Sequence, residues 1–244
     1  MLITFAVLCF FALVQSIYGV GLLIFGTPFL LLSNTGFDHA LGILLPSSFL
    51  ISLHQVFLYR KLEIHEAQSI FPVFFGLPLG LILVLQLEHD FKIMPVIGLV
   101  MLVAAFVRVS DGASRSLANI LSKNKGLFHF CNAFVHGVSN LGGALLPVYS
   151  ASVYSDKIRT LKCTSTFYSL YSGAQILLLI FMQKSEVFFD GLIFMPICLS
   201  CYFLGSKYMP MVVTQKLFDK LAIAFFWCIG TVLLFRSFAH QISP

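Results

Sequence analysis

Charged residues are scarce in this sequence. Asp, Glu, Lys and Arg make up 10% of its 244 residues, whereas hydrophobic residues make up 59%. Soluble domains carry about 25% charged residues, and a soluble chain of this length has too little interior to bury so much apolar surface. The composition therefore excludes a soluble globular protein and predicts a polytopic membrane protein. No hydrophilic stretch is long enough for a separate soluble domain, so we expect a single membrane domain over residues 1–244.

Signals for several other classes of protein are missing as well. The sequence has no basic cluster typical of nucleic-acid binding and no G-x-x-x-x-G-K-[ST] loop typical of ATP use. Its N-terminus lacks the positively charged region of a cleaved signal peptide, so we treat it as part of the mature chain. The six cysteines lie mostly in apolar segments, where a pair such as Cys198-x-x-Cys201 is typical of packing. We therefore expect no metal ion and no cofactor.

Apolar segments of two lengths are present. Six of them have about the 20 residues that one membrane span needs; these are Ala40–Leu58, Ile70–Leu87, Ile93–Val109, Leu161–Met182, Val187–Leu204 and Leu217–Phe235. Two others, Leu2–Leu32 and Phe128–Tyr154, are too long for one ordinary span and are interrupted by glycine and proline. Each of these two is either one long, broken helix or a hairpin of two half-helices that enters and leaves on the same side.

The distribution of Lys and Arg favours the hairpins. If both long segments cross, the 15 basic residues divide eight to seven between the two sides. If both are hairpins, twelve lie on one side and Lys92, Lys184 and Arg236 lie on the other. The positive-inside rule then predicts cytoplasmic basic loops and both termini outside. Each half contains a hairpin and three spans, so we expect two inverted repeats, 1–112 and 119–240, joined by a linker over 110–125.

The interruptions in the two long segments resemble each other. The first runs from Gly19 to Pro28 and the second from His136 to Pro147, and the two prolines lie 119 positions apart. Glycine and proline disturb backbone hydrogen bonding, which membrane proteins tolerate where neighbouring protein or a water-filled cavity receives the freed groups. Paired breaks in corresponding places of two halves are typical of the substrate site of a secondary transporter.

The breaks favour an anionic or neutral ligand. Half-helix N-termini carry unpaired N–H groups and the positive end of the helix dipole, and glycine lets an anion approach them. The middle portions of the spans contain no Lys, Arg, Asp or Glu, whereas a cation site normally includes an intramembrane carboxylate. We expect no catalytic residue and no metal ligand. The predicted substrate-binding residues are Gln15, Gly19, Gly21, Gly26, His136, Ser139, Asn140, Gly142 and Gly143.

Structural roles remain alternatives for several of these residues. Close helix packing alone would explain some of the glycines. His136 is either a cationic partner, a proton relay or a satisfied buried histidine. Two polar stripes, from Ser47 to Gln55 and from Ser165 to Gln175, either line the cavity or join neighbouring helices by hydrogen bonds.

Two motifs resemble the paired signatures of the sulfite exporter TauE/SafE family of membrane permeases: Gly19-x-Gly21 followed by Pro28, and Asn140-Leu141-Gly142-Gly143 followed by Pro147. The resemblance extends over nearly the whole chain. It implies transport of small anions such as sulfite, sulfonates or other organosulfur acids, usually across the bacterial inner membrane. Many members have a further glycine five residues before the first proline, where this chain has Leu23.

The sequence thus predicts a secondary transporter of small anions that works by alternating access around the two breaks. Its partners are then the anion and the lipid bilayer, and no signal indicates its oligomeric state or a coupling ion. One alternative is an anion channel with a pore between the hairpins. Another is an intramembrane enzyme that uses His136 or His129. We expect no enzymatic activity, because the sequence shows no carboxylate, metal-ligand set or activated nucleophile at that depth.

Overall fold

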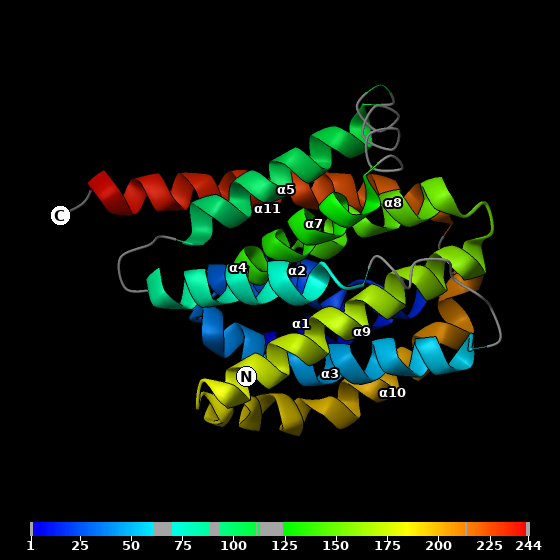
Figure 1. Cartoon of the computed structure of the whole chain (residues 1–244), viewed down its shortest axis with the longest axis horizontal. Coiled ribbons are helices and arrows are strands. Elements are labelled where there is room, and N and C mark those ends of the chain that lie inside the picture. The colour runs from blue at the N-terminus through cyan, green and yellow to red at the C-terminus, as the bar shows by residue number, and fades with distance from the viewer. Residues whose placement is uncertain are drawn as a thin grey trace.

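The computed structural model is all-helical over the residues that it describes, which are 2–60, 70–87, 93–110, 112, 124–212 and 214–242. This confirms the expected all-α fold. With the labels of Figure 1, the helices are α1 (Leu2–Tyr18), α2 (Leu22–Leu32), α3 (Phe37–Leu58), α4 (Val73–Leu87), α5 (Ile93–Val109), α7 (Lys125–Ser139), η2 (Gly142–Ala144), α8 (Leu146–Val153), α9 (Lys157–Phe181), η3 (Ser185–Val187), α10 (Phe188–Val212) and α11 (Gln215–Ile242).

The six predicted simple spans correspond to α3, α4, α5, α9, α10 and α11. The sequence places both ends of α5 correctly, whereas α9, α10 and α11 continue past the predicted apolar runs into polar ends. Among the described residues, three stretches are long and apolar enough to cross a membrane: Phe37–Leu58, Ser185–Tyr208 and Asp219–Phe238. The predicted linker over 110–125 lies largely outside the described residues.

The first long segment forms hairpin 1, in which α1 and α2 lie on either side of a tight turn. Gly19 has a φ of 70°, in the left-handed region that glycine adopts at no steric cost. The chain then turns back so closely that a Cβ at Gly21 would lie 2.6 Å from the backbone oxygen of Phe11 and the backbone nitrogen of Gln15. On the way back, the ring of Phe25 stacks on that of Phe11, with 5.5 Å between the centroids.

The second long segment forms hairpin 2 from α7, η2 and α8. Asn140 adopts the left-handed conformation with a φ of 62°, and its N–H donates to the carbonyl of His136 at 2.7 Å. A Cβ at Gly142 would lie 2.5 Å from the backbone oxygen of Asn132. An offset of 121 residues relates Gly19 to Asn140, Gly21 to Gly142, and the contact residue Phe11 to Asn132. The two turns therefore share one local geometry.

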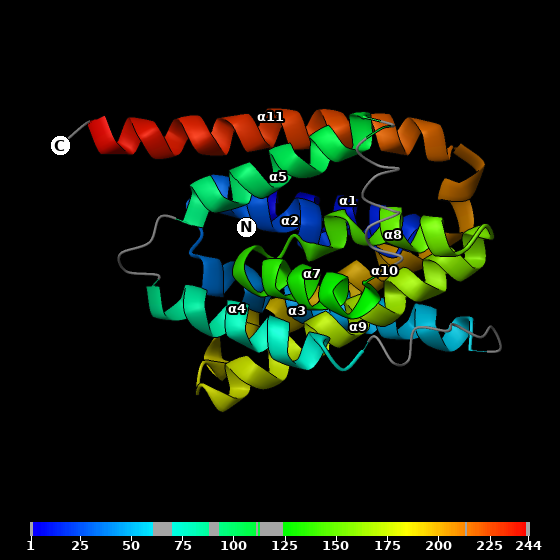
Figure 2. The same ribbon diagram turned by 45° about the horizontal axis from the view of Figure 1, so that its top comes forward.

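The helices run roughly along one direction, and the two hairpins lie inside the bundle (Figures 1 and 2). α3 packs against α9, α1 packs along α10, α4 packs along α7, and α5 crosses α11 where Gly98 meets Gly230. The α9–α10 turn and the C-terminal end of α11 lie at one end of the bundle, at the left of Figure 1. At the opposite end lie the α8–α9 turn and the junction of α10 with α11.

Polar side chains occupy the interior of the bundle and large apolar side chains cover its surface. Gln15, Gln55, His136 and Gln175 are among the fully buried polar residues. The most exposed apolar side chains include those of Leu177, Phe181, Phe189 and Phe235. Contiguous apolar surface of this kind is unfavourable in water, whereas polar groups in a membrane bundle normally face its interior. The distribution therefore supports a location in the lipid bilayer.

Candidate functional site

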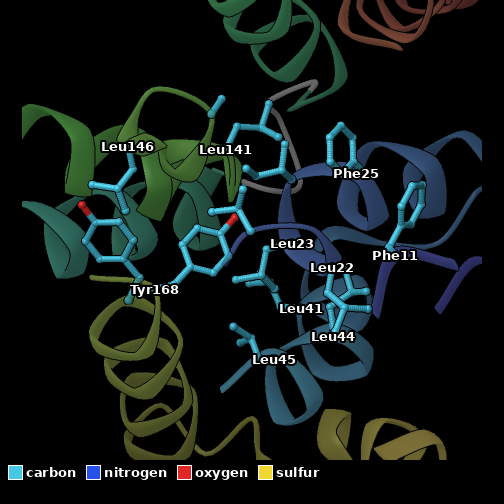
Figure 3. Close-up of a cluster of buried hydrophobic side chains, with 14 of the residues drawn as sticks. Phe11, Leu22, Leu23, Phe25, Leu41, Leu44, Leu45, Leu141, Leu146 and Tyr168 are labelled. Carbon is cyan, nitrogen blue, oxygen red and sulfur yellow. The ribbon is translucent and has the colours of Figure 1, made fainter. Parts of the chain in front are cut away.

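The two hairpins meet at a polar contact. The side-chain Nδ2 of Asn140, at the turn of hairpin 2, donates a hydrogen bond of 2.7 Å to Oγ1 of Thr27 in α2. Both residues are fully buried. Figure 3 shows a cluster of buried apolar side chains to which hairpin 1 contributes Leu23, hairpin 2 contributes Leu141 and α9 contributes Tyr168. A hydrogen bond in such surroundings is stronger than the same bond in water.

Gln15 organises the turn of hairpin 1. Its Oε1 accepts the backbone N–H of Leu22 at 3.1 Å and so caps the first turn of α2, where no backbone partner exists. Its Nε2 donates toward Oγ of Ser52 at 3.1 Å and Oγ of Ser48 at 3.3 Å, both on α3. The sequence predicts that the N–H groups at the start of α2 bind an anion. One of them, that of Leu22, already donates to Gln15.

Gln55, which lies on α3, connects hairpin 1 to α3 and α9 by hydrogen bonds. Its Nε2 donates to the backbone oxygen of Gln15 at 3.1 Å, and its Oε1 accepts from Oγ of Ser165 on α9 at 2.9 Å. Ser48, Ser52, Gln55 and Ser165 belong to the two polar stripes of α3 and α9. At these positions, the stripes join helices by hydrogen bonds.

Hairpin 2 is less completely bonded. Nε2 of His136 lies 3.2 Å from Oε1 of Gln175 on α9, and the imidazole packs against the ring of Tyr171 with 4.6 Å between centroids. Within the described part of the chain, the buried atoms Nδ1 of His136, Nε2 of Gln175 and Oδ1 of Asn140 have no hydrogen-bond partner. Buried polar atoms are nearly always bonded, so a cluster of exceptions is a candidate binding site.

The other predicted residues serve mainly as close-packing points. Gly26 faces the side chain of Leu44, and Gly143 faces the ring of Tyr168. Oγ of Ser139 donates to the carbonyl of Val135 at 2.6 Å. The predicted residues therefore form two groups. The group in hairpin 1 comprises Gln15, Gly19 and Gly21 at the turn and Gly26 further along α2. The group in hairpin 2 comprises His136, Ser139, Asn140, Gly142 and Gly143. Asn140 connects the groups through Thr27.

Sequence reasoning missed Thr27 and Arg108. The signal for Thr27 is its position, because it is a polar residue directly before Pro28 in an otherwise apolar helix. Arg108 stands in the last turn of a predicted span, and the charge distribution places it among the twelve basic residues of the cytoplasmic side. In the structure its side chain is only 7% exposed, and its Nη2 donates to the carbonyl of Ala144 in η2 at 2.8 Å. A cation therefore contacts the backbone of hairpin 2.

Over the residues that the structure describes, no group of three or more His, Cys, Asp or Glu side chains is arranged to hold a metal ion.

An all-helical bundle with a polar interior, an apolar surface and two opposed hairpins belongs to the class of polytopic membrane proteins. The family model described as Sulfite exporter TauE/SafE matches residues 4–233, so the chain belongs to the TauE/SafE family. The family is one of membrane permeases that export sulfur anions. No curated protein and no solved structure matches the chain.

Proposed function

We propose that the protein is a secondary transporter that moves small anions, such as sulfite, sulfonates or other organosulfur acids, by alternating access. The observation that carries the proposal is the hydrogen bond between Asn140 and Thr27, because it joins the turn of hairpin 2 to hairpin 1 in the interior of the bundle. In secondary transporters with broken helices, the substrate site lies where such elements meet. Membership of a permease family supports the same reading.

We place the substrate at this contact. The buried polar groups around hairpin 1 are engaged with one another, as Gln15 and Gln55 illustrate. Those around hairpin 2 retain bonding capacity at Asn140, His136 and Gln175. A bound anion would accept hydrogen bonds from the side-chain N–H groups of Gln175 and Asn140, whereas Oδ1 of Asn140 is an acceptor and does not bind it. Hydrogen bonds to a charged group are worth about 1.5–3 kcal/mol each.

We also propose that the two halves are inverted repeats and that they exchange their hairpins, so that each hairpin packs against a helix of the other half. The common offset of 121 residues between the turns supports the repeat. The packing of α1 on α10 and of α7 on α4 supports the exchange, because each hairpin then lies against a helix of the other half. Rocking of one half would move both hairpins relative to the substrate. Following the positive-inside rule, we assign the end of the bundle with the α8–α9 turn to the cytoplasmic side of a bacterial inner membrane.

A flux screen of the purified protein in liposomes tests the function. Uptake of sulfite, methanesulfonate, thiosulfate and acetate would be compared with that of empty liposomes. We expect protein-dependent flux of at least one sulfur oxyanion, and we expect Asn140→Ala to reduce it. Thr166→Val is a matched control, because the hydroxyl of Thr166 bonds to the carbonyl of Lys162 within its own helix. Absence of flux for every anion in a folded protein would contradict the proposal.

A further inference from the structure

Arg108 is a buried cation that touches hairpin 2. Besides its bond to Ala144, its Nη1 lies 3.4 Å from Oδ1 of Asp219 on α11, and its guanidinium carbon lies 5.7 Å from the ring centroid of Phe226. Arg108 therefore connects three elements: α5, which carries it, η2 of hairpin 2, and α11. Ala144 follows Asn140 by four residues, so the cation belongs to the same turn region as the proposed substrate site.

The bonding of this guanidinium is incomplete. Its Nε is buried and, within the described part of the chain, has no hydrogen-bond partner. Guanidinium–carboxylate pairs at full strength are bidentate, with distances of about 2.7–2.9 Å, so the 3.4 Å contact with Asp219 is a loose one. The carboxylate of Asp219 is also 44% exposed, whereas the side chain of Arg108 is 7% exposed. A buried charge with a loose, half-exposed counterion is suited to exchange of that counterion.

Asp219 also lines a cavity, so the counterion of Arg108 is accessible from that cavity. The cavity has a volume of about 470 Å³ and lies between the end of α1, the helix α8 and the start of α9. Its lining includes Tyr18, Pro147, Tyr154, Lys157, Thr160 and Asp219. Lys157 is exposed and brings a positive charge. An anion that enters this cavity therefore meets Asp219, whose carboxylate oxygen lies 3.4 Å from Nη1 of Arg108.

We infer that Arg108 is the cationic binding group for the transported oxyanion and that Asp219 is its exchangeable internal counterion. The entering anion replaces the carboxylate as the neutralising charge and gains the unused Nε–H. Because Nε shares an edge of the guanidinium with Nη2, its two-point contact is with Nε and Nη2. Ligands of this site are small anions with two oxygens on one centre, such as sulfite, sulfonates and carboxylates, because their spacing matches the guanidinium fork. The inference rests on the proposed function and names the group that compensates the ligand's charge.

Binding of methanesulfonate and of sulfite to the purified protein, measured by titration calorimetry, tests this assignment. Arg108→Gln removes the cation and should weaken binding by about tenfold to a hundredfold. Asp219→Asn removes the competing carboxylate and should leave binding as tight as in the wild type or tighter. A purely structural ion pair predicts the opposite pattern, in which both substitutions destabilise the fold and affect affinity alike.

Two further variants keep the experiment decisive. Arg108→Gln combined with Asp219→Asn leaves no lone charge, and this variant should fold and bind as weakly as Arg108→Gln. Lys184→Gln is the control, because it breaks the 3.3 Å pair with Asp38 at the opposite end of the bundle and should not change affinity.

Wild-type affinity in the double variant, or loss of affinity in Asp219→Asn equal to that in Arg108→Gln, would overturn the inference and leave the transport function standing. A wild-type protein that bound neither anion would contradict the transport function itself, and this inference with it.

Discussion

The side-chain oxygen of Gln15 holds the backbone N–H of Leu22 at 3.1 Å, so the end of α1 fixes the start of α2. The residue 121 positions later is His136, whose ring nitrogen bonds to Gln175 on α9 and not to its own hairpin. Hairpin 1 is therefore bonded internally as well as to α3, whereas hairpin 2 keeps polar atoms that have no partner among the described residues. We expect this difference to appear as a division between a mainly structural turn and a mainly ligand-binding turn.

Replacement of Gln15 tests the structural turn. Gln15→Leu leaves the N–H of Leu22 and the hydroxyl of Ser52 without their partner, and buried groups that lose a partner cost about 1–3 kcal/mol. The midpoint of thermal unfolding in detergent should fall. Ser16→Ala is the control, because the hydroxyl that it removes donates within α1, to the carbonyl of Leu13. Equal midpoints for Gln15→Leu and the wild type would contradict the capping role.

Asn140 and Thr27 test the ligand-binding turn. Asn140→Ala should weaken anion binding by about tenfold to a hundredfold, because a lost hydrogen bond to a charged group costs about 1.5–3 kcal/mol. Thr27→Val should weaken it on its own, but less so in the Asn140→Ala background, because the two side chains share one hydrogen bond. Titration calorimetry on the four proteins gives the coupling.

The charge at position 140 gives an independent result. Asn140→Asp adds a negative charge next to the proposed anion and should bind more weakly than Asn140→Ala. If Asn140→Asp bound sulfite as well as the wild type, the anion would not lie at this contact.

The turn glycines should tolerate no side chain. Gly21→Ala and Gly142→Ala would place a methyl group about 2.5 Å from backbone atoms of α1 and α7 respectively, so each hairpin must open. Overpacking of this kind costs about 1–3 kcal/mol, and both unfolding midpoint and flux should fall. Gly126→Ala is the matched control, because the new Cβ would meet the ring of Pro72 at an ordinary 3.7 Å. Wild-type behaviour of the two turn variants would show that the hairpins do not need this close approach.

Cysteine labelling tests the assignment of the two ends. In a background without the native cysteines, Ser185→Cys at the α9–α10 turn should react with an impermeant maleimide in intact cells. Ser155→Cys at the α8–α9 turn should react only after permeabilisation. Both serines are exposed, so differences in burial do not explain the contrast. The reverse labelling pattern would invert the topology.

The presence of the membrane-spanning helices was predictable from the sequence, because the thickness of a bilayer sets the length of an apolar run. The range of α5 follows from the apolar stretch alone, and the turns of both hairpins follow from Gly19-x-Gly21 and Asn140-Leu141-Gly142-Gly143. Helix ends were less predictable, since α9 begins at Lys157 and its polar first turn lies outside any apolar window.

Side-chain partners could not be derived in this way. Nothing in the local sequence shows that Gln15 turns its oxygen toward Leu22, or that Thr27 meets a residue 113 positions away. The charge distribution places Arg108 only on the cytoplasmic side, whereas tertiary packing brings it against η2. Which buried polar groups retain bonding capacity depends on such contacts, and these exist only in the folded bundle.

Counterflow of labelled sulfite in liposomes tests the central claim of anion transport by alternating access most directly. Liposomes loaded with unlabelled sulfite and diluted into a trace of labelled sulfite should accumulate label transiently above its equilibrium level. The initial rate should saturate with substrate, and Asn140→Ala should reduce both effects. A channel would instead carry label without accumulation and without saturation. Linear, unsaturated flux, or no protein-dependent flux at all, would contradict the account.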